Sequence, residues 1–266
     1  MQRDGSYCIS DFELLTAALS AASWRALGGS IRLITDSVAY AFLEQNGLIP
    51  LWDGGVTSEL DDMPEEIRPD TFWAGGKLFA LSKVPAPCFM IDTDFIPWQM
   101  PEISGIDLAV IHREDIQPDI YPPKEFFVFD TPFPKHWNWE ALPCNTAFCY
   151  FGTKHFKRLY TDTALRLMRC ARGHDELCYM VFAEQRLLSM CAESAGVTIH
   201  SFSDLDELFS FEQRSYTHLW GYKQVLHENP AERERFCRSC ARRLMRQFPD
   251  TGEICKTSPI LKQYFA

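Results

Sequence analysis

The sequence lacks any long hydrophobic run. None of its apolar stretches approaches the roughly 18 residues that a bilayer-spanning helix needs, so no transmembrane segment is expected. The chain opens without the pattern of a secretory signal peptide, and it contains no internal repeat and no low-complexity tract. We therefore expect a cytoplasmic protein.

An excess of positive charge is also missing. The chain has 26 Lys and Arg residues against 36 Asp and Glu residues, for a formal net charge of -10. A general nucleic-acid-binding protein would carry a basic face, so nucleic acid is not an expected partner. Apolar material is plentiful, since 46% of the 266 residues are hydrophobic and 14% are aromatic. That is enough for a sizeable core, in one large domain or one domain with an appendage.

The chain contains ten cysteines. In a chain of this length without a signal peptide, they are expected to be reduced and buried rather than joined in disulfides. The Cys237-x-x-Cys240 pair and Cys255 would permit a zinc site if His227 supplied a fourth ligand. We favour this interpretation less, because both members of the pair fall inside a predicted helix, whereas paired zinc ligands usually come from a turn.

The clearest chemical signal is the apolar run Cys88–Ile91 followed by Asp92, Thr93 and Asp94. The run predicts a strand that is buried on both faces, as in a parallel or mixed sheet covered by helices. Two carboxylates are costly to desolvate, so they are expected where the strand emerges at its carboxyl end. Ligands of open α/β sheets bind at that edge, and paired hard oxygen ligands suit Mg²⁺ or Mn²⁺ with a substrate phosphate.

The segments before this triplet follow an α/β order. A capping box of Ser10 and Glu13 begins a helix that ends at Gly28-Gly29. A strand over residues 31–35 ends at Asp36, a helix follows, and residues 48–52 are expected to form another strand. Asp70 is expected to cap the next helix, which contains Gly75-Gly76 and Lys77.

The segments after the triplet are expected to complete a mixed α/β domain. Strands are predicted over residues 107–111, 126–129, 146–151 and 197–200, and helices over residues 154–169 and 176–194. The fold class is therefore α/β, with a mixed, mainly parallel sheet flanked by helices and a C-terminal helical appendage. We expect a catalytic domain over residues 1–225 and a helical tail over residues 226–266.

This order of features resembles the GT-A fold of metal-dependent glycosyltransferases. The segment from His218 through Gly221 to Lys223 is similar to the H-x-x-G-x-x-K element of glycogenin-like and bacterial galactosyltransferase-like enzymes. Here the lysine lies two places after the glycine rather than three. The layout also resembles that of uncharacterised bacterial glycosyltransferase-like proteins, which implies a role in polysaccharide biosynthesis.

The resemblance implies a set of site residues. Asp92, Asp94 and His218 would hold a divalent metal, and their mixed oxygen and nitrogen ligands favour Mn²⁺ over Mg²⁺. Glu184 and Gln185 would face the acceptor and the anomeric carbon. In an inverting reaction Glu184 would act as the base. In a retaining reaction it would act as a nucleophile or orient the acceptor. Contacts with the nucleotide-sugar donor are expected from Asp36, Lys77, Asp92, Thr93, Asn145, Gly221 and Lys223. The acceptor would be a glycan or a lipid-linked sugar.

The sequence departs from the GT-A pattern at its start. The family opens with a strand that holds the nucleoside base, whereas only Tyr7-Cys8-Ile9 precede the predicted cap at Ser10. A non-catalytic GT-A-like protein that binds a glycan or a partner is therefore an alternative. A phosphatase of the haloacid dehalogenase type is a second one, but its D-x-D motif lies on the first strand and has Thr or Val two residues after the second Asp, where this chain has Ile96.

A basic amphipathic helix is predicted with Asn229 as its N-cap and Pro230 in its first turn. Its apolar stripe consists of Phe236, Cys240, Leu244 and Phe248, and its remaining surface carries Arg233, Arg235, Arg238, Arg242, Arg243 and Arg246. The favoured interpretation is a helix docked on the catalytic domain. The alternative is peripheral attachment to an anionic membrane, where a lipid-linked acceptor would be found.

Overall fold

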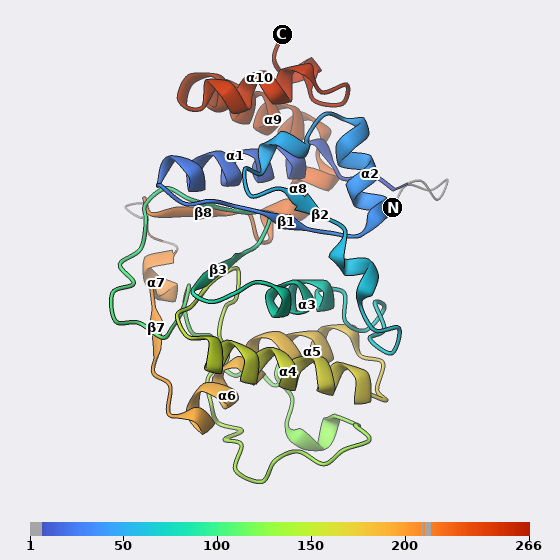
Figure 1. The fold of residues 1–266 in the computed structure, drawn as a ribbon, viewed down its shortest axis with the longest axis vertical. Coiled ribbons are helices and arrows are strands. Elements are labelled where there is room, and N and C mark those ends of the chain that lie inside the picture. The colour runs from blue at the N-terminus through green and yellow to red at the C-terminus, as the bar shows by residue number, and fades with distance from the viewer. Residues whose placement is uncertain (1–6, 209, 211–213) are drawn as a thin grey trace. The chain divides into compact units, whose positions relative to one another are not determined.

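The computed structural model describes residues 7–208, 210 and 214–266. The chain divides into two compact units (Figure 1). The first unit comprises Met1–Asp61, Thr93–Met100 and Arg214–Ala266, and the second comprises Asp62–Asp92 and Pro101–Gln213. Residues 226–266 thus pack within the first unit, and the expected domain boundary at residue 225 stays a prediction.

Helices form most of the first unit. Two short strand pairs accompany them: β1 pairs with β2 in parallel, and β4 pairs with β8 antiparallel. The helices are α1 (Asp11–Ala26), α2 (Ser37–Gln45), α8 (Tyr222–Glu228), α9 (Pro230–Gln247) and α10 (Pro249–Thr257), with 3-10 turns at Ile49–Leu51, Glu59–Asp62 and Lys262–Tyr264. The strands are β1 (Leu33–Ile34), β2 (Val56–Thr57), β4 (Phe95–Pro97) and β8 (Tyr216–His218).

Helix α1 is the centre of this unit. It packs against α9 on one side and β4 on the other, so that side chains around its whole circumference are buried, from Phe12 to Trp24 (Figure 1). A helix that is apolar all round is stable only when it is covered in this way. The predicted capping box of Ser10 and Glu13 is confirmed at its start.

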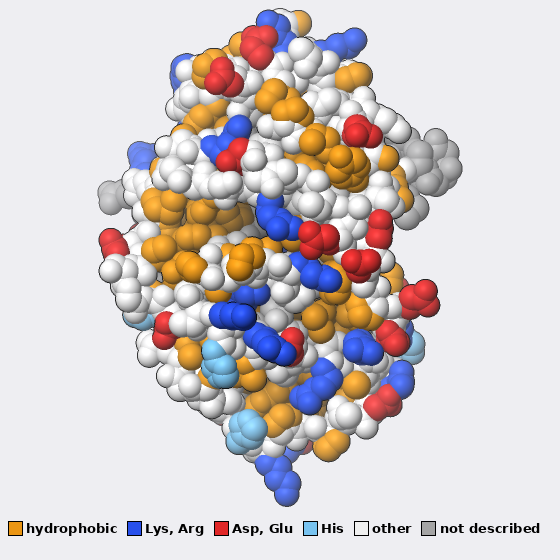
Figure 2. Space-filling view, in the orientation of Figure 1, with side chains coloured by type: hydrophobic (Ala, Val, Ile, Leu, Met, Phe, Trp, Pro, Cys, Tyr) orange, Lys and Arg blue, Asp and Glu red, His pale blue; other side chains and the backbone are white. Residues whose placement is uncertain are grey.

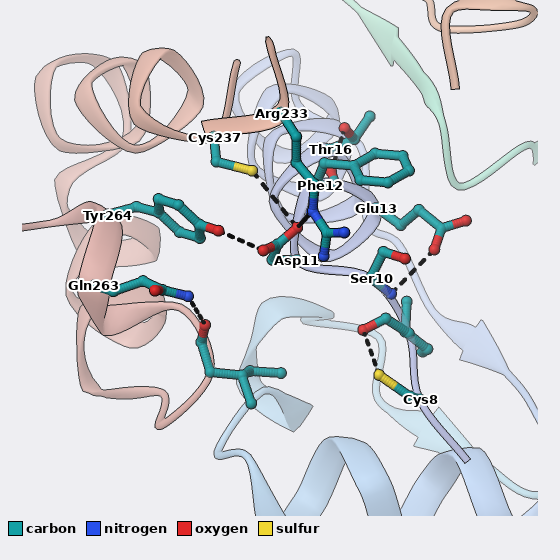
Figure 3. A network of polar contacts seen from close by, with 12 residues as sticks. Cys8, Ser10, Asp11, Phe12, Glu13, Thr16, Arg233, Cys237, Gln263 and Tyr264 are labelled. Atoms are coloured by element: carbon teal, nitrogen blue, oxygen red, sulfur yellow. Dashed lines mark hydrogen bonds and ion pairs between the residues drawn. The ribbon is translucent and has the colours of Figure 1, made fainter. Parts of the chain in front are cut away.

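A half-buried polar hub joins the two ends of the chain within the first unit (Figure 3). The carboxylate of Asp11, at the start of α1, accepts a hydrogen bond of 2.6 Å from Nε of Arg233 on α9 and another from the hydroxyl of Tyr264. Burial alone would raise the pKa of Asp11, but these two donors outweigh it and lower the pKa. The hub therefore stabilises the fold while Asp11 is ionised.

We expect Asp11→Asn to lower the free energy of unfolding at neutral pH by about 1.5–3 kcal/mol, the usual contribution of hydrogen bonds to a charged group. Because the folded-state pKa is depressed, this stabilisation is complete above the unfolded-state pKa of about 3.9 and is lost as the pH falls through the folded value. Urea denaturation of both proteins between about pH 7 and about pH 2.5 measures the difference. Glu44→Gln, which removes an exposed acid of α2, is the control. A difference that stayed constant over the whole pH range would contradict the assignment.

The second unit is built on a four-stranded sheet with strand order β3-β6-β5-β7. β6 runs antiparallel to both of its neighbours, and β5 pairs with β7 in parallel. The strands are β3 (Cys88–Ile91), β5 (Leu108–Val110), β6 (Phe148–Phe151) and β7 (Ile199–Ser201). The helices are α3 (Gly75–Lys83), α4 (Lys154–Cys170), α5 (Glu176–Val181), α6 (Leu187–Ala195) and α7 (Leu205–Leu208), with a 3-10 turn at Lys124–Phe126 and a π-helical turn at Phe182–Arg186.

The core of this unit lies between the sheet and its helices. α4 packs against α3, α6 and β6, and buried aromatic rings such as Phe151, Phe156 and Tyr160 fill the space between them. The mixed α/β class is confirmed, but the expectation of a mainly parallel sheet is wrong. β5 is joined to β6 by the irregular segment 111–147 rather than by a crossover helix, so the two strands can lie antiparallel.

Several predicted elements need correction. β3 forms where it was expected, but it is an edge strand, and most of its side chains are half-buried rather than buried on both faces. Residues 48–52 form a 3-10 turn instead of a strand, in keeping with Pro50, which cannot donate to a strand ladder. Asp70 does not cap a helix, because α3 begins at Gly75. Residues 126–129 contribute only one isolated bridge, from Phe129 to Ala171.

Surface composition adds little to these assignments. Hydrophobic side chains lie among acidic and basic ones on the face shown in Figure 2, and Val38, Trp73 and Val128 are among the exposed apolar residues. No helix in the described part of the chain combines the length and the apolar composition that crossing a membrane requires. All ten cysteines carry free thiols in the described structure, and most of them are buried.

Candidate metal and ligand site

The pairing of β4 with β8 creates the first polar cluster, inside the first unit. In the register of these strands Phe95 lies opposite His218, and the backbone N–H of Leu219 donates to the carbonyl of Asp94. The carboxylate of Asp94 thereby lies beside the imidazole, with 3.6 Å between Oδ2 and Nε2 of His218. Only 5% of the surface of Asp94 is exposed, so this carboxylate needs a cationic or hydrogen-bonding partner.

Lys223 supplies that partner. Its Nζ lies 2.8 Å from Oδ2 of Asp94, and it is brought there by α8, whose N-cap is Gly221. The predicted set of Asp94, His218, Gly221 and Lys223 is therefore gathered in one place within the first unit.

Trp220 is a member of this cluster that the sequence reasoning missed. Its ring stacks on His218, with centroids 5.9 Å apart and an angle of 10° between the planes. Its φ of 40° lies in the left-handed region, which is uncommon for a bulky residue. Such backbone strain is concentrated at functional sites. A tryptophan directly before the motif glycine was the available signal.

Asp92 belongs to the end of β3 in the second unit, where its backbone N–H donates to the carbonyl of Ala147. The boundary between the units falls between Asp92 and Thr93. The covalent chain alone keeps the Cα atoms of Asp92 and Asp94 within about 7 Å, because two trans peptide units span no more. Both carboxylates are thus available in one short stretch of chain.

The second cluster is centred on Lys77 of α3, inside the second unit. Its ammonium donates to the carbonyl of Thr146 at 2.9 Å and lies 2.6 Å from both Asp92 Oδ1 and Glu184 Oε1. An ammonium has three N–H donors, and these contacts engage all of them. Lys77 was predicted to contact donor phosphate, but in this arrangement it links two carboxylates to the backbone of Thr146, two residues before β6.

The two carboxylates beside Lys77 determine the protonation state of its side chain. Burial lowers the pKa of Lys77, but Asp92 and Glu184 outweigh it and raise the pKa well above the usual value. Lys77 is therefore an ammonium ion at neutral pH. The carboxylate of Glu184, which is 4% exposed, also accepts a hydrogen bond of 2.7 Å from the hydroxyl of Thr146.

Glu184 and Gln185 lie in the π-helical turn that interrupts the predicted helix over residues 176–194. Single π turns inside α-helices occur frequently at functional sites. Gln185 contacts the hydroxyl of Tyr121, which also donates to Glu114 at 2.7 Å. Asn145 donates to the other oxygen of Glu114 at 2.9 Å. The predicted residues Asn145 and Gln185 are thus connected through Tyr121 and Glu114, which the sequence reasoning missed although Glu114 closely follows an apolar strand.

Other predicted site residues lie apart from these clusters. Asp36 is the N-cap of α2 and accepts a hydrogen bond of 2.7 Å from the backbone N–H of Ala39, so its position has a structural explanation. Thr93 is exposed at the unit boundary. Cys237, Cys240 and Cys255 belong to the hydrophobic core of the first unit, where burial raises the pKa of each thiol to about 12.

The chemistry of the first cluster fits a divalent cation. A buried carboxylate and an imidazole are adjacent, and a second carboxylate lies two residues earlier in the chain. Mixed oxygen and nitrogen ligands are suited to Mn²⁺ and related ions. The second cluster offers a buried carboxylate, Glu184, that is held in place by two donors.

Comparisons of the chain with protein-family models, with curated proteins and with solved structures find no match in any of the three.

We expect Lys77→Met to destabilise the protein by about 3–5 kcal/mol, because it leaves Glu184 buried without its counter-ion. Glu184→Gln keeps the pair of Lys77 with Asp92 and is expected to cost less, about 1–3 kcal/mol. The double variant should lose less stability than the sum of the two single variants, since the two groups interact directly. Urea denaturation of all three measures this coupling.

Lys83→Met is the matched control, because Lys83 lies exposed on the same helix. It should change stability by no more than about 0.5 kcal/mol. Strict additivity of Lys77→Met and Glu184→Gln would show that the buried pair makes no energetic contribution.

Proposed function

We propose that the protein is a metal-dependent glycosyltransferase that transfers a sugar from a nucleotide-sugar donor to a glycan or lipid-linked acceptor. The observation that carries this proposal is the adjacency of Asp94, His218 and Lys223, which come from segments more than 120 residues apart in the chain. A buried carboxylate, an imidazole and a lysine are the groups needed to bind a metal–diphosphate complex.

The metal is proposed to be held by Asp94 and His218, with Asp92 as a third ligand. When bound, a divalent ion supplies charge neutralisation of the diphosphate leaving group. Asp92 has one oxygen near Lys77, which leaves its second oxygen as the proposed ligand atom. Lys223 is a mobile point charge that can move from Asp94 to a phosphate oxygen once another cation neutralises the carboxylate.

Glu184 is the proposed acceptor-side group. Its carboxylate is buried, lies 2.6 Å from the ammonium of Lys77, and is oriented by the hydroxyl of Thr146. A carboxylate held in this way is suited either to accept a proton from an acceptor hydroxyl or to orient that hydroxyl. Gln185 and Asn145 would border the sugar, and the network of Glu114 and Tyr121 would keep their amides in one orientation.

The metal proposal makes predictions of opposite sign for two neighbouring residues. Asp94→Asn should weaken Mn²⁺ binding by at least about tenfold, because it removes a charged ligand. Lys223→Gln should strengthen the binding of Mn²⁺ alone, because it removes a competing cation from Asp94. The same variant should weaken the binding of a nucleoside diphosphate in the presence of Mn²⁺. Isothermal titration calorimetry measures all three affinities.

Glu44→Gln, which removes one exposed negative charge from the first unit, is the control and should bind Mn²⁺ as the wild type does. Thermal unfolding of each variant in the absence of metal separates a lost ligand from a lost fold. Equal Mn²⁺ affinity of Asp94→Asn and the wild type would refute the metal site.

The donor is tested by a thermal-shift screen of nucleotide sugars with and without Mn²⁺. Binding to the native state raises the melting temperature according to RT ln(1 + [L]/Kd), so a ligand at about 100 times its Kd stabilises by about 2.7 kcal/mol. We expect stabilisation that depends on Mn²⁺, followed by slow hydrolysis of the same donor without added acceptor. Metal-dependent binding without any hydrolysis would favour a non-catalytic scaffold, and no stabilisation by any nucleoside diphosphate would count against the donor class.

A further inference from the structure

A cavity of about 540 Å³ lies within the first unit, away from the face that carries His218. It is bounded by α1, α9 and the β4–β8 pair. Its apolar lining consists of Leu19, Ile96, Trp98, Leu219, Phe236 and Cys240, and its charged lining consists of Arg242, Arg243 and Arg246. Its volume falls within the range of about 300–1,000 Å³ that is typical of small-molecule sites.

The strand alternation explains why the cavity and the candidate metal site use different side chains of the same pair of strands. Successive side chains of a strand point to opposite faces. Ile96 lies opposite Thr217 in the register, and both line the cavity, whereas Phe95 and His218 form the neighbouring pair. The cavity is therefore a separate site, and none of the proposed metal ligands lines it.

The arginines of α9 fall into two sets. Arg233, Arg235 and Arg238 are paired with Asp11, Glu232 and Glu234, respectively. Among the described residues, no carboxylate lies within 4.0 Å of Arg242, Arg243 or Arg246. These three are spaced so that neighbouring turns bring them to one side of the helix, where like charges repel each other.

The position of Arg243 is fixed by an aromatic contact. Its guanidinium lies 4.2 Å from the centroid of Trp98, and the indole N–H of Trp98 donates to the hydroxyl of Thr217 at 2.8 Å. A stacked guanidinium keeps its N–H fork free for a planar or tetrahedral anion. One cationic group is thus already oriented at the mouth of an apolar cavity.

We propose that this cavity binds a phosphorylated amphiphile, with its phosphate on Arg242, Arg243 and Arg246 and its apolar body against Ile96, Leu219 and Phe236. Three guanidinium groups that have no acidic partner in the described part of the chain, whose net charge is -10 overall, match a dianionic phosphate monoester better than a single carboxylate. The apolar lining selects against inorganic phosphate, because burial of a hydrocarbon adds affinity in proportion to its area.

The test uses the full-length protein and octyl phosphate as the probe, in calorimetric titrations at about 0.15 M salt. Octyl phosphate should bind at least about tenfold more tightly than inorganic phosphate or 1-octanol, because only the amphiphile uses both parts of the cavity. Arg243→Gln and the double variant Arg242→Gln/Arg246→Gln should each weaken binding by at least about tenfold. Ser239→Phe, which adds a bulky side chain to the cavity lining without changing its charge, should do the same.

Arg238→Gln is the matched control, since it removes a positive charge from the same helix outside the cavity. It should change the affinity by less than about twofold. An equal loss in Arg238→Gln and Arg243→Gln, an unaltered affinity of Ser239→Phe, or equal binding of inorganic and octyl phosphate would each overturn the proposal.

Vesicles of phosphatidylcholine with and without phosphatidate distinguish the sources of the phosphate. Retention of the wild type but not of Arg243→Gln on phosphatidate vesicles assigns the site to a lipid headgroup. Binding of octyl phosphate without retention on vesicles assigns it to a free phosphorylated metabolite. Both results support the proposal, and failure to bind either form overturns it without bearing on the metal site.

Discussion

The pairing of β4 with β8 is the constraint on which the first unit depends. It joins Phe95 to His218 across more than 120 residues of chain, and in doing so it brings Lys223 to Asp94. β4 also packs against α1, and residues of both strands line the cavity that carries the arginines. These two three-residue strands thus contribute to both the cluster of Asp94, His218 and Lys223 and the cavity, and β4 also contacts the central helix.

Each carboxylate of the D-x-D triplet is neutralised by a lysine. Asp92 contacts Lys77 and Asp94 contacts Lys223, but the two lysines differ in how firmly they are held. All three N–H donors of Lys77 are engaged, and its pKa is raised. Displacing Lys77 would therefore leave the buried carboxylate of Glu184 without its counter-ion. The side chain of Lys223 is 37% exposed, so water can solvate it when it leaves Asp94. The proposed metal would therefore displace Lys223 and leave Lys77 in place.

Local patterns in the sequence predicted the parts of the fold that depend on local interactions. The capping box at Ser10, the strand Cys88–Ile91 and the cap at Asn229 depend on residues close in the chain, and they form where expected. Strand direction and edge position depend on which distant segments pair. The apolar run of β3 could not reveal that β6 lies antiparallel beside it and that none of the described strands pairs with its other edge.

The candidate sites show the same division. The sequence indicated Asp94, His218 and Lys223 through a motif, and the structure brings them together. It could not indicate that Lys77 binds Glu184 and Asp92, because that contact needs α3, β3 and the π turn to meet. Glu114 and Tyr121 lie in the irregular segment 111–147, where no periodicity identifies the side chains that point inward.

The basic C-terminal helix illustrates why net charge is a poor guide to a surface. The sequence presents six arginines on α9 as one basic face, which is the pattern of a membrane-binding helix. In the fold, three of them form ion pairs, including the pair of Arg233 with Asp11. The other three line an apolar cavity. A cavity with three guanidinium groups that have no acidic partner among the described residues favours one phosphate that carries its own apolar body, whether that body is part of a bilayer or free in solution.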